Sequence, residues 1–254
     1  MQRLVINRSS MHPITKTPVL NGKGEKMDAS FYIKNDPTWF QDEVIFRPIA
    51  AWQKYYTYNA YKNKYEGETV YIRSTWDDEQ KKYIVNQPYD NLGTLRLGRP
   101  DTEEFKKLDH FTQQMWRTKA KWQMCLFGLV YFSNKAEPIL VEFSYAGKKG
   151  MDILEMLKGI KRPLWQQTYI TNLELNGDHW QPAFKKLKFE LAVDMNEQQK
   201  TMIKKAVIDT YKHGDAHDAK IMKAHEEALT GKALEEFKKN KPVLTSNLDE
   251  EVPY

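Results

Sequence analysis

The sequence lacks the features that mark secreted, membrane-spanning and zinc-binding proteins. It has one cysteine, Cys125, in 254 residues, which excludes an internal disulfide and a multi-cysteine zinc site. The longest apolar run, residues 124–132 with one glycine, is too short to cross a bilayer, and the first residues lack the apolar core of a signal peptide. We therefore expect a cytoplasmic protein that contacts no membrane. Cys125 is expected to be a buried apolar side chain rather than a nucleophile.

The composition is that of a folded and mildly basic protein. Charged residues make up 29% and aromatic residues 13% of the chain, and the formal net charge is +5. The aromatic content argues against wholesale disorder. The positive charge permits nucleic-acid binding without requiring it.

One stretch combines aromatic rings with lysines. Residues 52–65 carry one tryptophan and five tyrosines, interleaved with three lysines. Such rings stack on bases at about 1–3 kcal/mol per base while neighbouring cations bind phosphates, so the pattern favours a single strand held without reading of its sequence. The alternative is that the tyrosines pack a sheet with their hydroxyls at its rim.

Further cations lie on strands predicted downstream. Arg96 and Arg99 belong to a short strand, and Arg117, Lys119 and Lys121 share one strand face if the period of two holds. A basic stripe suits the wall of a groove, although cations at the entrance of a strand can equally be solvated. The residues predicted to bind DNA are Trp52, Lys54, Tyr55, Tyr56, Tyr58, Tyr61, Lys62, Lys64, Arg73, Trp76, Arg96, Arg99, Arg117, Lys119 and Lys121.

No stretch has the spacing of a catalytic or metal site. The acidic run at residues 77–79 lacks matching carboxylates at motif spacing, so it is interpreted as a solvated loop. His213, His217 and His225 are interpreted as ordinary surface histidines rather than metal ligands. We therefore predict a binding protein that is not an enzyme, with no catalytic residue, no metal and no cofactor.

The order of predicted elements fits a mostly β fold. Asn176 and Gly177 form a strong hairpin signal between two alternating stretches. Strands are expected at residues 43–50, 139–145, 165–175 and 180–193, with a short amphipathic helix within 150–160. This order fits a five-stranded Greek-key barrel of the oligonucleotide-binding type, whose helix lies between its third and fourth strands. A β-sandwich with an inserted helix fits nearly as well.

A helical segment follows the predicted barrel. Asn196 and Gln199 have the spacing of a capping box, which begins a helix expected to end at Gly214. A second helix is expected to end at Gly231, and a third is stopped by Pro242. The predicted organisation is an N-terminal arm at 1–40 with one short strand at 31–33, a barrel domain at 41–194, a helical segment at 195–241 and a flexible acidic tail at 242–254.

The chain ends in three carboxylates followed by an apolar residue, a proline and an aromatic residue. These six residues are Asp249, Glu250, Glu251, Val252, Pro253 and Tyr254. The ending resembles the tails of single-stranded-DNA-binding proteins of bacteria and of tailed phages. Bacterial members commonly end in several Asp residues followed by Ile-Pro-Phe, and some phage members end in an acidic run closed by an aromatic residue. The resemblance implies an oligonucleotide-binding fold and a disordered tail that docks replication and recombination proteins. A short acidic end is also typical of a solvated terminus.

The expected function is therefore protection of single-stranded DNA in phage replication, recombination and repair, in the host cytoplasm. The protein would act as a monomer or a homo-oligomer. One alternative is a phage structural or adaptor protein that uses its aromatic face for protein contacts, since tyrosine and tryptophan are also interface residues. A strand-annealing recombinase is a nearer alternative. A nuclease would need a cluster of carboxylates or a lysine-centred site, which the sequence does not display.

Overall fold

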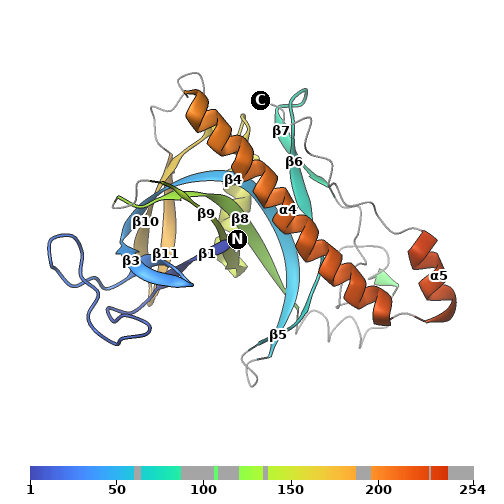
Figure 1. Ribbon diagram of the computed structural model, residues 1–254, viewed down its shortest axis with the longest axis horizontal. Coiled ribbons are helices and arrows are strands. Elements are labelled where there is room, and N and C mark those ends of the chain that lie inside the picture. Colours follow the sequence, from blue (N-terminus) through green and yellow to red (C-terminus); the bar gives the residue numbers. More distant parts are fainter. Residues whose placement is uncertain are drawn as a thin grey trace. The chain divides into compact units, whose positions relative to one another are not determined.

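The computed structural model describes residues 1–59, 64–86, 106–107, 120–133, 137–186, 196–228 and 230–239 (Figure 1). The chain divides into two compact units. Unit 1 consists of Met1–Ala50, Leu126–Phe143 and Ile160–Val207. Unit 2 consists of Ala51–Cys125, Ser144–Gly159 and Ile208–Tyr254. Several strands and the longest helix contribute residues to both units.

Nine strands form one large mixed sheet. They are β1 (Gln2–Asn7), β2 (Ser30–Ile33), β3 (Asp36–Gln41), β4 (Glu43–Asn59), β5 (Lys64–Glu68), β8 (Ala120–Tyr131), β9 (Ile139–Ala146), β10 (Tyr169–Asn176) and β11 (His179–Lys186). Their order is β11-β10-β4-β8-β9-β1-β2-β3, and β5 pairs with the far part of β4. Strand β1 runs parallel to β9, whereas β1–β2, β2–β3, β4–β10, β10–β11 and β4–β5 are antiparallel. A separate two-stranded ribbon consists of β6 (Arg73–Asp77) and β7 (Lys82–Asn86).

The expectation of a mostly β chain with helices is confirmed. The finer expectation, a five-stranded barrel of the oligonucleotide-binding type, is not established by these strands. Nine strands join the large sheet, and their path ends at β11 and β3 without closing within the described part of the chain.

The first 41 residues contain three strands where the sequence indicated one. Strand β2 confirms the strand expected at residues 31–33, and β1 and β3 flank it in the chain. The exposed and buried residues of β1 do not alternate regularly, since Leu4 and Asn7 are its buried positions. A strand without the period of two gives no clear signal in the sequence.

The core of unit 1 is built around an aromatic side chain of β9. Phe143 lies 5.9 Å from Phe31, 6.3 Å from Phe46 and 6.4 Å from Phe184 between ring centroids. The four rings come from β9, β2, β4 and β11, so the cluster ties together strands distant in sequence. Edge-to-face and tilted packing of this kind adds about 0.5–1.5 kcal/mol per pair to the gain from burial.

The hairpin expected at Asn176 and Gly177 is confirmed. Strands β10 and β11 pair from Tyr169 with Lys186 to Asn176 with His179, which leaves two residues in the turn. Gly177 has a φ of 60°, and a glycine with positive φ at the first turn position matches the twist of the flanking strands. The continuation of the second strand expected at residues 187–193 lies outside the described residues.

The remaining elements are α3 (Gly147–Lys158), the short 3₁₀ helix η1 (Leu164–Gln166), α4 (Glu197–Ala228) and α5 (Gly231–Lys239). Helix α3 confirms the short helix expected after β9. The capping box is also confirmed, because the N–H of Gln199 donates to Asn196 Oδ1 at 2.9 Å and the N–H of Asn196 donates to Gln199 Oε1 at 3.1 Å. Among the described helices, none is long and apolar enough to span a membrane.

The helix end expected at Gly214 is wrong, because α4 continues through this residue to Ala228. Glycine often ends a helix, but here its missing side chain serves packing instead. A Cβ at this position would lie 2.5 Å from Cζ3 of Trp52. The close approach of α4 to β4 therefore requires glycine at position 214.

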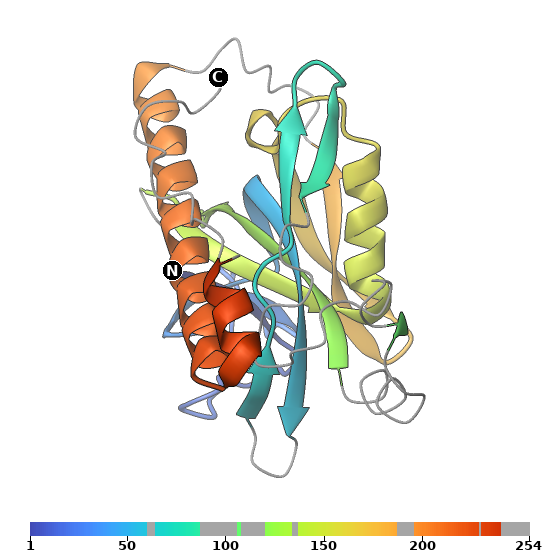
Figure 2. The ribbon, with the colours of Figure 1, turned by 90° about the vertical axis from the view of Figure 1, so that its right-hand side faces the viewer.

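Within unit 2, α3 and α4 pack on opposite faces of β4 (Figure 2). Trp52 faces α4, where it meets Gly214. Its neighbour Gln53 faces the other way and accepts a hydrogen bond from Nε1 of Trp122 at 3.0 Å. The ring of Trp122 in turn abuts Gly150 of α3. Because successive side chains of a strand alternate between faces, this arrangement decides which residues of the aromatic stretch are covered.

Candidate nucleic-acid interface

Trp52, the first ring of the aromatic stretch, is a core residue. Its side chain is fully buried, and its ring centroid lies 5.3 Å from those of Tyr71 and Tyr211. A base cannot stack on a ring whose faces are already covered by protein. The stacking role predicted for Trp52 therefore does not fit its position, and its contribution is to packing between β4 and α4.

Lys54 lies on the same covered face as Trp52. It is 2% exposed, and its Nζ is 3.3 Å from Oε1 of Glu68 and 5.3 Å from the centroid of Tyr71. A buried ammonium group needs such partners to offset the loss of its hydration. Lys54 is thus engaged inside unit 2, so the phosphate contact predicted for it does not fit this conformation.

Arg73, at the start of the ribbon, is also engaged internally. Its Nη2 lies 2.7 Å from Asp215 Oδ1 and 2.7 Å from Asp218 Oδ2, and its guanidinium carbon is 4.8 Å from the centroid of Trp52. Burial disfavours the charge, but the two carboxylates outweigh it and raise the pKa of Arg73. The side chain stays charged and anchors the ribbon to α4, so the phosphate contact predicted for it does not fit this conformation.

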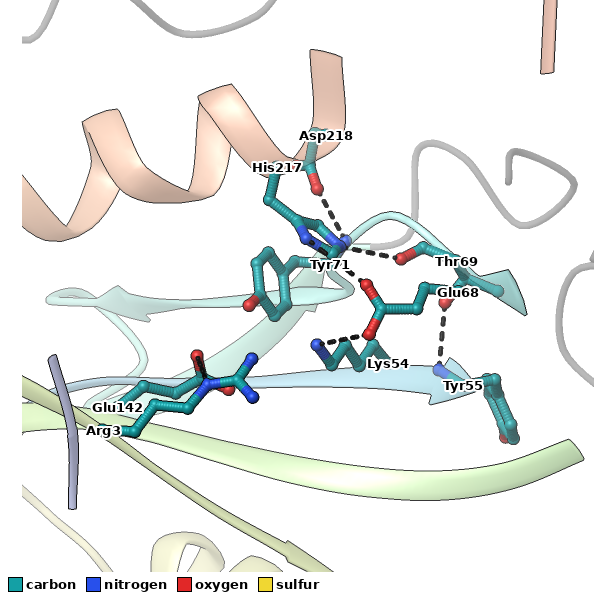
Figure 3. Close-up of polar contacts among 9 residues, drawn as sticks. All are labelled: Arg3, Lys54, Tyr55, Glu68, Thr69, Tyr71, Glu142, His217 and Asp218. Carbon is teal, nitrogen blue, oxygen red and sulfur yellow. Dashed lines mark hydrogen bonds and ion pairs between the residues drawn. The ribbon is translucent and has the colours of Figure 1, made fainter. Parts of the chain in front are cut away.

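Helix α4 also holds the segment that leads into the ribbon (Figure 3). The N–H of Tyr71 donates to Asp218 Oδ1 at 2.9 Å, and His217 Nε2 is 3.2 Å from the carbonyl oxygen of Thr69. On its other side the segment pairs with β4, through two backbone hydrogen bonds between Ile72 and Gln53. The base of the ribbon is therefore held on both sides within unit 2. Figure 3 also draws the ion pair of Arg3 with Glu142, which belongs to unit 1.

The ribbon itself places aromatic rings and lysines together at a surface. Trp76 and Tyr83 are directly opposite each other in the register, and their rings meet edge to face at 5.2 Å. Both are partly exposed, and the side chains of Lys81 and Lys82 are exposed. Ile84, the neighbour of Tyr83, is 38% exposed. Among the predicted stacking residues whose side chains the structure describes, Trp76 has the surroundings that fit this role best.

The tip of the ribbon is acidic and internally paired. Asp78 accepts hydrogen bonds from Lys81 Nζ at 2.9 Å and from Trp76 Nε1 at 3.2 Å. These donors, first Lys81 and then Trp76, lower the pKa of the Asp78 carboxyl. Asp77 accepts from the N–H of Gln80 at 2.8 Å. The interpretation of residues 77–79 as a solvated loop agrees with this turn.

Three other predicted residues are partly or fully exposed in unit 2. Tyr55 and Tyr56 are partly exposed on successive positions of β4, and Lys121 is exposed on β8. Adjacent positions of a strand face opposite ways, so the two tyrosines cannot share one stacking surface. Lys121 is followed by Trp122, which is partly buried against α3.

Several predicted residues lie outside the described residues. These are Tyr61, Lys62, Arg96, Arg99, Arg117, Lys119 and the tail residues Asp249, Glu250, Glu251, Val252, Pro253 and Tyr254. Tyr58 and Lys64 belong to β4 and β5, but the structure describes only their backbone. Their predicted roles stay predictions.

Two sets of residues were not predicted from the sequence. Tyr83 follows a turn after Trp76, and the turn-forming run between them is a signal that would place the two rings across a hairpin. Glu68, His217 and Asp218 form the internal network, and partners 147 and 148 positions apart in the chain give no local signal. His217 is thus a partly buried residue of the network and not a surface histidine.

Within the described part of the chain, no group of three or more His, Cys, Asp or Glu side chains could hold a metal ion. Cys125 is fully buried, which confirms its expected packing role. No family model matches the chain, and no curated protein or solved structure matches it either.

Proposed function

We propose that the chain binds single-stranded DNA without sequence preference and that the β6–β7 ribbon supplies a stacking surface. The observation that carries this proposal is the partly exposed pair of Trp76 and Tyr83, with exposed lysines in the same hairpin. A base that stacks on an aromatic ring gains about 1–3 kcal/mol, whatever its identity. Lysines beside it add attraction for the phosphates that falls with salt.

The charges of the ribbon indicate where a strand would cross it. Asp77, Asp78 and Glu79 make the tip unfavourable for phosphate, since only Asp78 pairs with the neighbouring Lys81 in the described contacts. A strand is therefore expected to cross the face that carries the rings of Trp76 and Tyr83, which pair one position away from the acidic turn. Lys82 pairs with Asp77 and faces the other side of the ribbon, so its charge attracts phosphates to the ribbon without lying under the stacked base.

The wider proposal joins this surface to the residues predicted from the sequence. Tyr55, Tyr56 and Lys121 of unit 2 are candidates for further contacts, together with the basic residues that lie outside the described ranges. An oligonucleotide-binding barrel, a protective role in phage replication, recombination and repair, and docking of partner proteins by the acidic tail belong to the same proposal. They rest on the resemblance of the tail and on the aromatic stretch.

The deciding experiment is a titration with fluorescently labelled oligo-dT, read by anisotropy at low and at moderate salt, with duplex of equal length as control. Trp76→Ala and Tyr83→Ala are each expected to weaken binding by about 5–150-fold, which corresponds to about 1–3 kcal/mol of lost stacking. Trp180→Ala is the matched control, because Trp180 is a partly exposed tryptophan of the β10–β11 hairpin in unit 1. The affinity of the Trp180→Ala variant for oligo-dT should equal that of the unaltered protein.

Two outcomes would contradict the proposal. If the unaltered protein binds oligo-dT at neither salt concentration, the single-strand function is wrong. If it binds but Trp76→Ala and Tyr83→Ala retain full affinity, the ribbon is not the stacking surface. Circular dichroism of each variant shows whether the fold is intact.

A second function is favoured by the apolar character of the ribbon. Ile84, the residue after Tyr83, is 38% exposed, and exposed apolar and aromatic side chains also suit protein contacts. In this alternative the chain is an adaptor or structural protein of a phage. This alternative would be favoured if the protein does not bind DNA, and if it binds a protein partner with an affinity that does not depend on salt and that Trp76→Ala abolishes.

A further inference from the structure

A histidine links α4 to the segment that leads into the ribbon, and both of its ring nitrogens face acceptors. Nε2 of His217 is 3.2 Å from the carbonyl oxygen of Thr69, and Nδ1 is 3.8 Å from Oε2 of Glu68 (Figure 3). The ring also packs against Tyr71, with 4.4 Å between centroids. Neither a carbonyl nor a carboxylate can donate a proton, so the donors must come from the imidazole.

The number of protons on the ring therefore decides how well it fits this position. A neutral imidazole has one N–H, which the Thr69 carbonyl requires, and it would then present a lone pair to Glu68. The protonated ring carries an N–H on both sides and a positive charge facing the carboxylate. Only this form complements both neighbours at once.

The surrounding charges favour the same form. Among the described side chains, the network includes the cations Lys54 and Arg73 and the carboxylates Glu68, Asp215 and Asp218. None of these five side chains is more than 22% exposed. A positive charge on His217 is attracted by the Glu68 carboxylate that faces Nδ1, and such attraction is stronger where water is scarce.

The groups that face the ring come from three elements. Lys54 of β4 and Glu68 of β5 lie on the strand side, and Tyr71 stacks on the ring. On α4 the titratable neighbours are His213, one turn earlier, and Asp218. Burial raises the pKa of Asp218, against the opposing effect of Arg73 and of the Tyr71 N–H. Asp218 is therefore the competing site for a proton.

We infer that His217 is a proton-operated latch. When protonated it fastens α4 to the segment at residues 69–73, and when it loses the proton the segment opens more often. Because that segment is the base of the β6–β7 ribbon, the order of the ribbon should depend on pH. The stabilisation is present at acidic pH and is lost as the pH rises through the range where the ring deprotonates.

The test is amide hydrogen exchange of Tyr71 in the full chain without nucleic acid, so the result does not depend on the proposed DNA binding. The Tyr71 N–H donates to Asp218 and exchanges when the segment leaves α4. After correction for the intrinsic rate, protection is expected to fall about tenfold between about pH 5.5 and about pH 8, the range in which an imidazole ordinarily loses its proton. In His217→Gln, which keeps a donor for Thr69 but cannot titrate, protection should be independent of pH.

The matched control is His179→Gln, at an exposed histidine of the β10–β11 hairpin, which should keep the profile of the unaltered protein. Glu68→Gln removes the carboxylate beside Nδ1 and should flatten the profile, and it tests the latch even if His217→Gln fails to fold. A flat profile in the unaltered protein overturns the inference. So does an unchanged profile in His217→Gln, which would assign the titration to Asp218 or His213.

Discussion

Replacing Gly214 with alanine should destabilise the protein, although the opposite would hold at an ordinary helix position. In the exposed interior of a helix, Gly→Ala stabilises by about 1 kcal/mol. At Gly214 the added Cβ would lie 2.5 Å from Cζ3 and 2.8 Å from Cη2 of Trp52, and 3.1 Å from Nη2 of Arg73. Real Cβ atoms do not approach a ring this closely, so α4 or the tryptophan must move.

The magnitude follows from how little room the tryptophan has. Trp52 is fully buried between Tyr71 and Tyr211, so its ring cannot withdraw without disturbing both. Overpacking of a tight core costs about 1–3 kcal/mol, and contacts this short place Gly214→Ala at the upper end. After the gain in helix propensity, we expect a net loss of about 2 kcal/mol.

Urea unfolding followed by far-ultraviolet circular dichroism measures this loss. Ala219→Gly, at an exposed position of the same helix, should cost about 1 kcal/mol from propensity alone. Trp52→Phe removes the two ring atoms that the methyl group would meet, so in that background Gly214→Ala should cost at least about 1 kcal/mol less. If Gly214→Ala raises the unfolding midpoint in the unaltered background, the packing explanation for the continuous α4 is refuted.

Two further predictions concern unit 1. Asn196→Ala removes the capping box of α4 and should lower the free energy of unfolding by about 1 kcal/mol, measured by urea unfolding, whereas Asn196→Ser should largely preserve it. Burial raises the pKa of Tyr169 to about 12. Between about pH 10 and about pH 12 the folded protein therefore keeps the phenolic proton that the unfolded chain releases. Its stabilisation is therefore full below about pH 10 and falls by roughly 2–3 kcal/mol as the pH rises to about 12. Ultraviolet titration of the tyrosines should show one fewer late-titrating group in Tyr169→Phe, and an unchanged titration would contradict the assignment.

The elements that were predicted correctly are those set by neighbours in the sequence. The turn at Gly177 needs only a residue that tolerates positive φ, and the capping box needs only Asn196 and Gln199. Both are formed by side chains or backbone groups within four residues of each other. Distant parts of the chain have little influence on such local structure.

The elements that were missed depend on partners far away in the sequence. Gly214 was interpreted as a helix end because nothing near it reveals the indole ring that it accommodates. The lysines of the aromatic stretch were interpreted as exposed, yet Lys54 follows Trp52 by two positions and so shares the face that α4 covers. The sequence shows which residues share a strand face, but the covered face is decided by the helix that packs there.

The candidate interface was predictable in part for the same reason. Trp76 was predicted to stack on bases because it is an aromatic residue near other aromatic and basic residues in the sequence. Its partner Tyr83 could have been found from the turn between them. The internal pairing of Arg73 with Asp218 could not, because their positions differ by 145 residues. A cation in a basic stretch is a candidate for phosphate binding only until its carboxylate partners are known.

Among the described strands, the outermost two of the large sheet, β3 and β11, each contain a proline, Pro37 and Pro182. A proline is tolerated in a sheet only where its nitrogen faces away from the paired strand, so each outer edge lacks one donor. At Pro37 the carbonyl oxygen is also occupied, since His12 Nε2 donates to it at 2.8 Å. These edges are poor templates for an added strand. Copies of the chain brought close together would therefore stay separate folded units at these edges, and contacts between them there would have to be made by side chains.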